Sequence, residues 1–225
     1  MDISCLLVFV IFTLIAVFMV AAVIIGYVKE KKRTEQWQQV AQQLGLPFLG
    51  ERDDLLPRLA NLRIFQRGSD RTIRNVVAGE MGPVRVTLGD FRYTTGSGKN
   101  RRTHHFTVCI VENDALEVPA CYLRPERRFL DALGSLFGGQ DIDFEEDEEF
   151  SRSFVLQGES EAAVRELFNP EVRAWFCANP VANLQFEARG NTLALHTGRR
   201  YPPGEVSQLL QWALEITKVL GHRNR

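Results

Sequence analysis

The sequence is poor in cysteine and carries no excess of charge of either sign. Its four cysteines are Cys5, Cys109, Cys121 and Cys177; none forms a CxxC pair, and Cys5 lies in an apolar run. This pattern excludes a disulfide framework and a zinc knuckle, and free thiols are expected. Apart from Asp2, 27 acidic residues balance 27 basic ones, all of them after residue 28. A nucleic-acid partner is therefore not expected, because binding to phosphates requires a basic surplus.

Charged residues are also missing from a long stretch near the N-terminus. The 26 residues from Ile3 to Val28 contain none. As a helix they would measure about 39 Å, enough to cross a hydrocarbon core of about 30 Å. A cleaved signal peptide would need basic residues ahead of a shorter apolar run and a cleavage site after it. The stretch therefore predicts an uncleaved transmembrane helix, with the lipid bilayer as its partner.

A basic cluster follows this stretch and predicts its orientation. Lys29, Lys31, Lys32 and Arg33 stand on one side, and Asp2 stands on the other. Basic residues that flank a membrane helix remain in the cytoplasm. We expect a single-pass protein of the cell (inner) membrane with its N-terminus outside and its soluble part in the cytoplasm. The same cluster is expected to lie at anionic headgroups.

The rest of the chain divides into a short helix and one domain. Neither Gly nor Pro occurs between Gly26 and Gly45, and Trp37, Val40, Ala41 and Leu44 have the spacing of an amphipathic helix. We expect a membrane anchor over residues 1–28, a juxtamembrane helix over 29–45 that continues it, and a soluble domain over 46–225. Such a helix would hold the domain close to the bilayer.

Alternating apolar residues predict an antiparallel sheet with several helices. Strands are expected at Ile73–Glu80, Val84–Leu88, His104–Glu112 and Ala120–Leu123, and a further strand at Phe150–Leu156. Short helices are expected at Asp54–Leu62, after Pro125, and after the N-cap residues Ser160 and Asn169. A hairpin around Gly190-Asn191 and a closing helix from Val206 to Leu220 complete an α+β fold.

Candidate catalytic residues are few. Asp90, His104 or His105, and Cys109 fall on neighbouring strands and could meet as a nucleophile and base, but they have no spacing signature. The segment Gly96–Lys99 lacks the remainder of a phosphate-binding loop and joins two strands, so a hairpin loop is expected. No metal or cofactor site is predicted.

An acidic stretch follows a Gly-Gly pair. It comprises Asp141, Asp143, Glu145, Glu146, Asp147, Glu148 and Glu149. It lacks the spacing of a calcium loop. A solvated loop or a docking surface for a basic partner is expected.

The layout as a whole resembles a group of uncharacterised bacterial single-pass membrane proteins. The similarity rests on the apolar anchor with its basic flank, on Arg74-Asn75-Val76, on Asp141-Ile142-Asp143-Phe144 and on the late hairpin and helix. It implies no activity. The leading hypothesis is a non-enzymatic interaction or scaffold domain that binds a protein partner or a second copy of itself. The alternative is a membrane-tethered hydrolase with its site at Asp90, His104 or His105, and Cys109.

Overall fold

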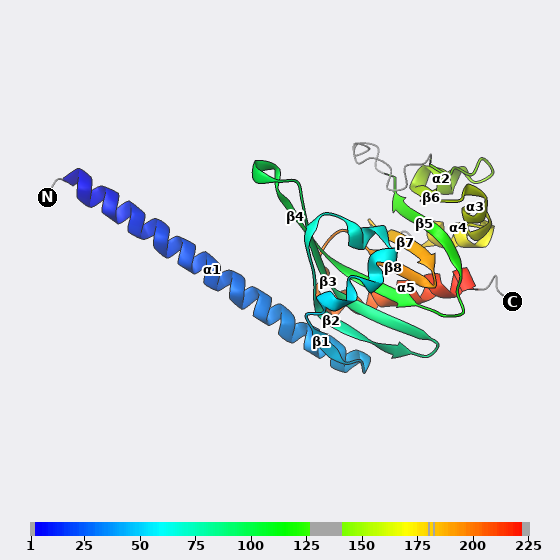
Figure 1. Cartoon of the computed structure of the whole chain (residues 1–225), viewed down its shortest axis with the longest axis horizontal. Helices are drawn as coiled ribbons and strands as arrows, with labels where there is room; N and C mark the ends of the chain where they lie inside the picture. The colour runs from blue at the N-terminus through cyan, green and yellow to red at the C-terminus, as the bar shows by residue number, and fades with distance from the viewer. Residues whose placement is uncertain (1–2, 127–140, 180, 182, 222–225) are drawn as a thin grey trace.

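The computed structural model describes residues 3–126, 141–179, 181 and 183–221. It shows an α+β protein in which a long N-terminal helix leads to an antiparallel sheet with shorter helices (Figure 1). In chain order the elements are α1 (Ile3–Leu44), β1 (Phe48–Gly50), the 3₁₀ turns η1 (Asp53–Leu55), η2 (Arg58–Asn61) and η3 (Arg63–Gln66), β2 (Ser69–Met81), β3 (Val84–Thr95), η4 (Gly98–Asn100), β4 (Arg102–Glu112), β5 (Val118–Pro125), α2 (Glu148–Ser153), β6 (Phe154–Gly158), α3 (Glu161–Leu167), α4 (Pro170–Ala178), β7 (Gln185–Gly190), β8 (Thr192–His196), η5 (Pro203–Glu205) and α5 (Val206–Gly221).

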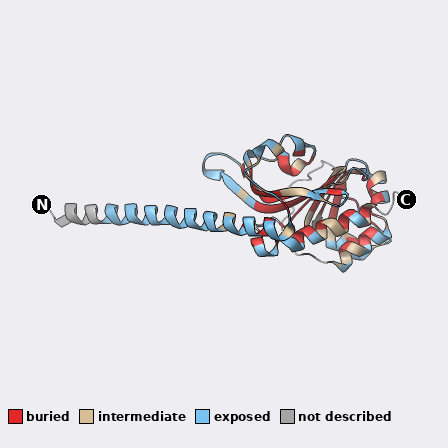
Figure 2. Ribbon diagram, turned by 90° about the horizontal axis from the view of Figure 1, so that it is seen from below, coloured by how far each residue is buried: buried red, intermediate tan, exposed pale blue. Residues whose placement is uncertain are grey.

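Helix α1 has two parts with opposite surroundings (Figure 2). Its apolar part is long enough to span a membrane. Among the described side chains, 13 of the 14 exposed large hydrophobic ones lie between Ile11 and Val28. Patches of this size on soluble proteins are rare and mark contact with lipid or protein. Near its end the helix buries Trp37, Val40 and Ala41 against the sheet. It stops before Gly45, whose φ of 66° suits the left-handed end of a helix.

Eight strands form one sheet in the order β1-β2-β3-β4-β8-β7-β5-β6, and all of its pairings are antiparallel. The longest pairing joins β3 to β4 through eleven opposed residue pairs, from Arg85↔Glu112 to Thr95↔Arg102. Short turns link β2 to β3, β3 to β4 and β7 to β8, as the alternating sequence predicts, whereas the other neighbours are joined by longer segments.

The sheet has a core on each face. The larger core packs the end of α1 together with α5 and residues of α2, α3 and α4 against one face. The smaller core places the 3₁₀ turns η2 and η3 on the other face, where Phe65, Phe91, Tyr93 and Phe106 meet. Asp90 lies on the face of the larger core, where it contacts Trp37.

Two local predictions are wrong, and one cannot be compared. The first half of the strand expected at Phe150–Leu156 is the helix α2, because Asp147 caps it by accepting the Phe150 amide at 3.1 Å. The helix expected at Asp54–Leu62 is two 3₁₀ turns separated by Pro57, which cannot donate to a continuous helix. The helix expected after Pro125 falls largely outside the described residues.

Candidate functional site

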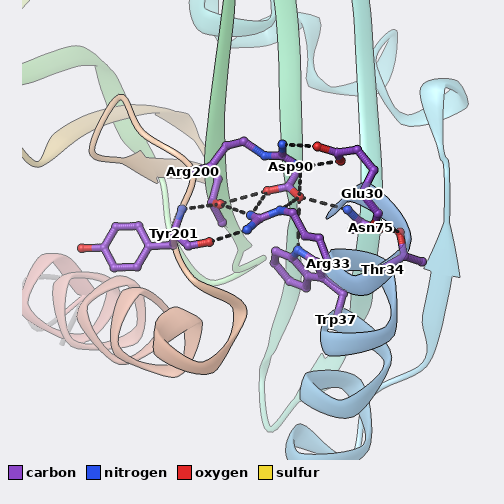
Figure 3. A network of polar contacts seen from close by, with 9 residues as sticks. Glu30, Arg33, Thr34, Trp37, Asn75, Asp90, Arg200 and Tyr201 are labelled. Carbon is purple, nitrogen blue, oxygen red and sulfur yellow. Dashed lines mark hydrogen bonds and ion pairs between the residues drawn. The ribbon is translucent and has the colours of Figure 1, made fainter. Parts of the chain in front are cut away.

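Asp90 is the centre of a polar network that joins α1 to the sheet (Figure 3). It lies in the middle of β3, opposite Thr107 of β4, and it is buried. The alternation of β3 places it on the same face as Val86 and Leu88, so a carboxylate occupies a position that the pattern assigns to the core. Burial of an ionised carboxylate requires several donors, and the surrounding residues supply them.

Arg33 of α1 forms a bidentate ion pair with this carboxylate. Its Nε donates to Oδ2 at 2.7 Å, and its Nη2 donates to Oδ1 at 2.6 Å. The remaining Nη1 donates to the backbone oxygen of Tyr201 at 2.8 Å. The parallel fork of a guanidinium fits a carboxylate in this way, whereas a lysine could not reproduce it. Arg33 therefore contacts both β3 and the loop that follows β8.

Three neutral donors complete the environment of Asp90. Trp37 Nε1 donates to Oδ2 at 3.1 Å, Asn75 Nδ2 to Oδ2 at 3.0 Å, and Thr107 Oγ1 to Oδ1 at 3.0 Å. Asn75 sits at an irregularity in the pairing of β2 with β3 and has a φ of 54°, a conformation that asparagine tolerates better than most residues. Its Oδ1 also accepts from Thr34 of α1 at 2.9 Å.

A second ion pair lies beside the first. Arg200 donates from Nη1 and Nη2 to the two carboxylate oxygens of Glu30 at 2.6 and 2.8 Å. Its Nη2 also lies 3.5 Å from Asp90 Oδ2. Glu30 and Arg33 are both on α1, so two separate ion pairs hold one helical turn. We call Glu30, Arg33, Trp37, Asn75, Asp90, Thr107 and Arg200 the Asp90 network.

The network keeps its carboxylates ionised. Burial alone would raise the pKa of Asp90, but the hydrogen bonds and charge of Arg33, helped by Asn75 and Arg200, outweigh it and lower that pKa. The hydrogen bonds from Arg200 likewise lower the pKa of Glu30 against the opposing effect of burial. Both acids are therefore charged at neutral pH.

A buried network of this kind fixes geometry more than it adds stability. Ion pairs removed from water gain little over well-packed apolar side chains, but the loss of one partner leaves an uncompensated charge. The bidentate pair, the indole donor and the buried stripe of Trp37, Val40 and Ala41 all require the same rotation of α1 about its axis. The helix and the sheet therefore meet at a defined angle.

The structure gives the candidate catalytic residues other contacts. Asp90 already accepts hydrogen bonds from five side chains. Cys109 is fully buried in the larger core, and that burial raises the pKa of its thiol. His104 stacks on Tyr93 at 4.6 Å and shares a hydrogen bond with Thr95. His105 is exposed and four residues from Cys109, about 13 Å along a strand.

Among the described residues, no group of three or more histidine, cysteine, aspartate or glutamate side chains is placed to hold a metal ion. The segment Gly96–Lys99 is part of the β3–β4 hairpin loop and opens only the 3₁₀ turn η4.

The residues of the basic cluster lie in two different environments. Lys29, Lys31 and Lys32 are exposed on α1. Arg33 departs from the expectation that it lies at headgroups, because its guanidinium turns inward to Asp90 and its side chain is only 13% exposed. One turn of helix thus presents lysines to solvent and an arginine to the sheet.

The acidic stretch is anchored to the domain at several points. Asp147 caps α2 and pairs with Arg173 at 2.7 Å, and Glu146 pairs with the same guanidinium at 3.3 Å. Asp141 accepts from Gln157 at 2.9 Å, and Glu148 pairs with Arg152. Asp143, Glu145 and Glu149 are exposed. The carboxylates therefore divide into a structural set and a solvent-facing set.

Sequence reasoning placed Asp90 in a catalytic group and overlooked its pairing with Arg33. A signal was present, because Asp90 follows Val84, Val86 and Leu88 at the spacing of a buried face. A charge at such a position needs a buried partner. Which of the many arginines supplies it is a matter of tertiary contact between residues 57 positions apart.

Comparison with known proteins gives one similarity of fold. No protein-family model and no curated protein sequence matches the chain. Among solved structures, the crystal structure of the mycobacterial trehalose monomycolate transport factor A, TtfA, superposes with a TM-score of 0.54 at 16% identity. The match covers 84% of this chain and 93% of that chain. At this identity the likeness shows a shared fold, and the chain is an α+β protein with an N-terminal helix able to span a membrane.

Proposed function

We propose that this chain is a non-catalytic accessory protein of the cell membrane that presents its domain to a partner at a fixed angle. One observation carries the proposal: the Asp90 network binds α1 to the sheet without an intervening linker. An enzyme that acts on soluble substrates would work equally well on a flexible tether and on a rigid junction. A rigid junction is useful where the position of the domain relative to the bilayer matters.

The orientation proposed is the one with the domain on the cytoplasmic side. Lys29, Lys31 and Lys32 follow the apolar part of α1 and are exposed, which favours retention of that end in the cytoplasm. A fluorescent protein fused after Arg225 should fluoresce, and alkaline phosphatase fused there should be inactive. The reverse pattern would refute this orientation.

An accessory role also agrees with the name of the protein that shares the fold, which is a transport factor. For this chain we propose a scaffold or adaptor that contacts another membrane protein or a second copy of itself. The docking surface proposed is the solvent-facing part of the acidic stretch, Asp143, Glu145 and Glu149. These carboxylates suit a basic partner surface.

Photocrosslinking tests this surface. The photoreactive residue p-benzoylphenylalanine, placed at Asp143 in the full chain, should give one discrete adduct in intact membranes. Neutralisation of the other two carboxylates (Glu145→Gln and Glu149→Gln) should reduce the adduct several-fold. A matched control, Glu80→Gln with Glu117→Gln, removes two exposed charges elsewhere and should leave it unchanged. No adduct, or equal loss in the control, would count against the docking surface.

A further inference from the structure

The β3–β4 hairpin extends beyond the body of the sheet on the side of the apolar part of α1. Figures 1 and 2 share their horizontal axis, and in both the tip of the hairpin lies toward the N-terminal end of α1. The strands remain paired to Thr95↔Arg102, and η4 forms the tip. Gly96 makes the turn possible, because its φ is 71° and a side chain at this position would collide with the backbone oxygen of Asn100.

The hairpin is long enough to reach the level at which α1 enters the membrane. Both elements start from one point, the pair of Asp90 with Arg33. Val28, the last residue of the uncharged run, is five residues before Arg33, or about 8 Å along a helix. Gly96 is six residues beyond Asp90, or about 20 Å along a strand. At an inclination of up to about 60° to α1, such a strand still rises about 10 Å along the helix axis and passes the lysines.

The tip of the hairpin is basic. No acidic residue occurs from Phe91 to Val111. Lys99, Arg101 and Arg102 are all exposed. Arg101 pairs with Asp70 at 2.7 Å, but both partners are exposed and the tip retains a positive surplus. The neighbouring residues are small and polar, a composition that headgroups accommodate.

We infer that this tip is a second membrane contact, in which Lys99, Arg101 and Arg102 bind the anionic phospholipid headgroups of the leaflet from which α1 emerges. Lys29, Lys31 and Lys32 on α1 would then give one basic contact with the bilayer, and the hairpin tip would give a second. The inference rests on the proposed membrane crossing of α1. Phosphates attract such cations over about a Debye length, roughly 8–10 Å.

A second membrane contact would fix the orientation of the domain, which α1 alone does not determine. A domain attached to one transmembrane helix can turn with that helix about the membrane normal and can tilt with it. A basic hairpin held at the surface, to one side of α1, restricts the tilt and keeps one face of the sheet toward the bilayer. The acidic stretch would then be held on the side away from the lipid, where a partner reaches it.

A nitroxide on the hairpin tests the contact in the full chain. The label is attached at Ser97→Cys after Cys5 and Cys177 are replaced by serine; Cys109 and Cys121 are buried. The protein is reconstituted in phosphatidylcholine vesicles with or without about 30% phosphatidylglycerol, a mixture with a negative surface. Accessibility to a neutral nickel chelate is then measured. A label at Ser153→Cys, on α2 far from α1, is the reference position.

We expect the anionic lipid to lower accessibility at residue 97 at least threefold and to leave residue 153 unchanged. The triple variant Lys99→Gln, Arg101→Gln and Arg102→Gln should abolish that protection. The control Arg58→Gln, Arg85→Gln and Arg152→Gln removes three exposed cations elsewhere, each within ion-pair distance of an acid, and it should keep the protection.

Three outcomes would overturn the inference: equal accessibility in both lipids, protection that survives the triple variant, or protection in neutral vesicles that rises with protein density, which would indicate a second copy. Extraction of the chain from vesicles by alkaline carbonate is scored separately. A chain that is extracted refutes the proposed membrane crossing, whereas a chain that resists extraction with an unprotected hairpin refutes the second contact alone.

Discussion

Arg33 and Asp90 stand 57 residues apart and form a bidentate ion pair with N···O distances of 2.7 and 2.6 Å. Arg33 belongs to the helix that carries the apolar run, and Asp90 belongs to the centre of the sheet. The pair therefore connects the helix able to enter lipid with the sheet of the domain. Trp37 and Glu30 reinforce it from the same side of α1.

The substitution Asp90→Asn should destabilise the protein by about 3–5 kcal/mol, because Arg33 loses its counter-charge while it remains largely buried. In a detergent-solubilised sample this corresponds to a fall in Tm of roughly 10 °C, followed by circular dichroism. Asp54→Asn is the matched control. It breaks a solvent-accessible bidentate pair with Arg52 and should leave the free energy of unfolding nearly unchanged. Similar losses in the two variants would show that Arg33 does not depend on Asp90.

Trp37 combines a buried ring with a hydrogen bond, and two substitutions separate these contributions. Trp37→Phe keeps most of the ring but removes the Nε1 donor to Asp90, a hydrogen bond to a charged group that contributes about 1.5–3 kcal/mol. Trp37→Ala also opens a cavity in the larger core and should cost about 3–5 kcal/mol. Denaturant titration of both variants checks the order. A negligible loss in Trp37→Phe would indicate that packing alone matters, whereas equal losses in the two variants would assign the whole effect to the hydrogen bond.

Stability should fall steadily as the pH drops from about 6.5 to about 3, because His196 is buried against Phe106 and its burial lowers its pKa to about 3. Below its ordinary pKa the unfolded chain binds a proton that the folded protein does not bind, so acid favours unfolding with a slope of up to about 1.4 kcal/mol per pH unit. The loss of the Asp90 carboxylate, whose pKa is lowered, adds to this below pH ~4. Stability at several pH values in the wild type and in His196→Gln checks the prediction; an unchanged slope would assign the acid sensitivity elsewhere.

Thiol alkylation should distinguish the cysteines. Burial raises the pKa of Cys109 and Cys121, whereas Cys177 is only partly covered. With Cys5 replaced by serine, iodoacetamide at pH 8 should modify Cys177 first and reach the other two only after denaturation. Mass spectrometry of the digested protein gives the order. Rapid modification of Cys109 in the folded protein would revive the hydrolase alternative.

The fold was largely predictable from the sequence, because alternation and capping are local signals. The strands at Val84–Leu88 and His104–Glu112, the capped helices after Ser160 and Asn169, and the closing helix all follow from residues within a few positions of each other. The incorrect prediction of a strand over the whole of Phe150–Leu156 also arises from a local signal. Its alternation fits a strand, but Asp147 supplies a cap that starts a helix.

The site was less predictable, because its partners come from four distant segments. Arg33, Asn75, Asp90 and Arg200 converge only when the sheet and α1 have docked. The sequence shows a charge at a core position of a strand and an arginine in a basic run. It contains no signal that pairs them, so Arg33 was assigned to the headgroups and Asp90 to a nucleophile and base.

A distance measurement across the junction of α1 and the sheet decides whether they form one rigid body. Nitroxides at Val23→Cys on the exposed apolar part of α1 and at Ser153→Cys on α2 are placed in the full chain with Cys5 and Cys177 replaced by serine. Pulsed electron–electron double resonance in lipid nanodiscs should then give a single narrow distribution. Asp90→Asn should broaden it, and Asp54→Asn should leave it narrow. A broad or multiple distribution with the Asp90 network intact would mean that the domain swings freely on its helix.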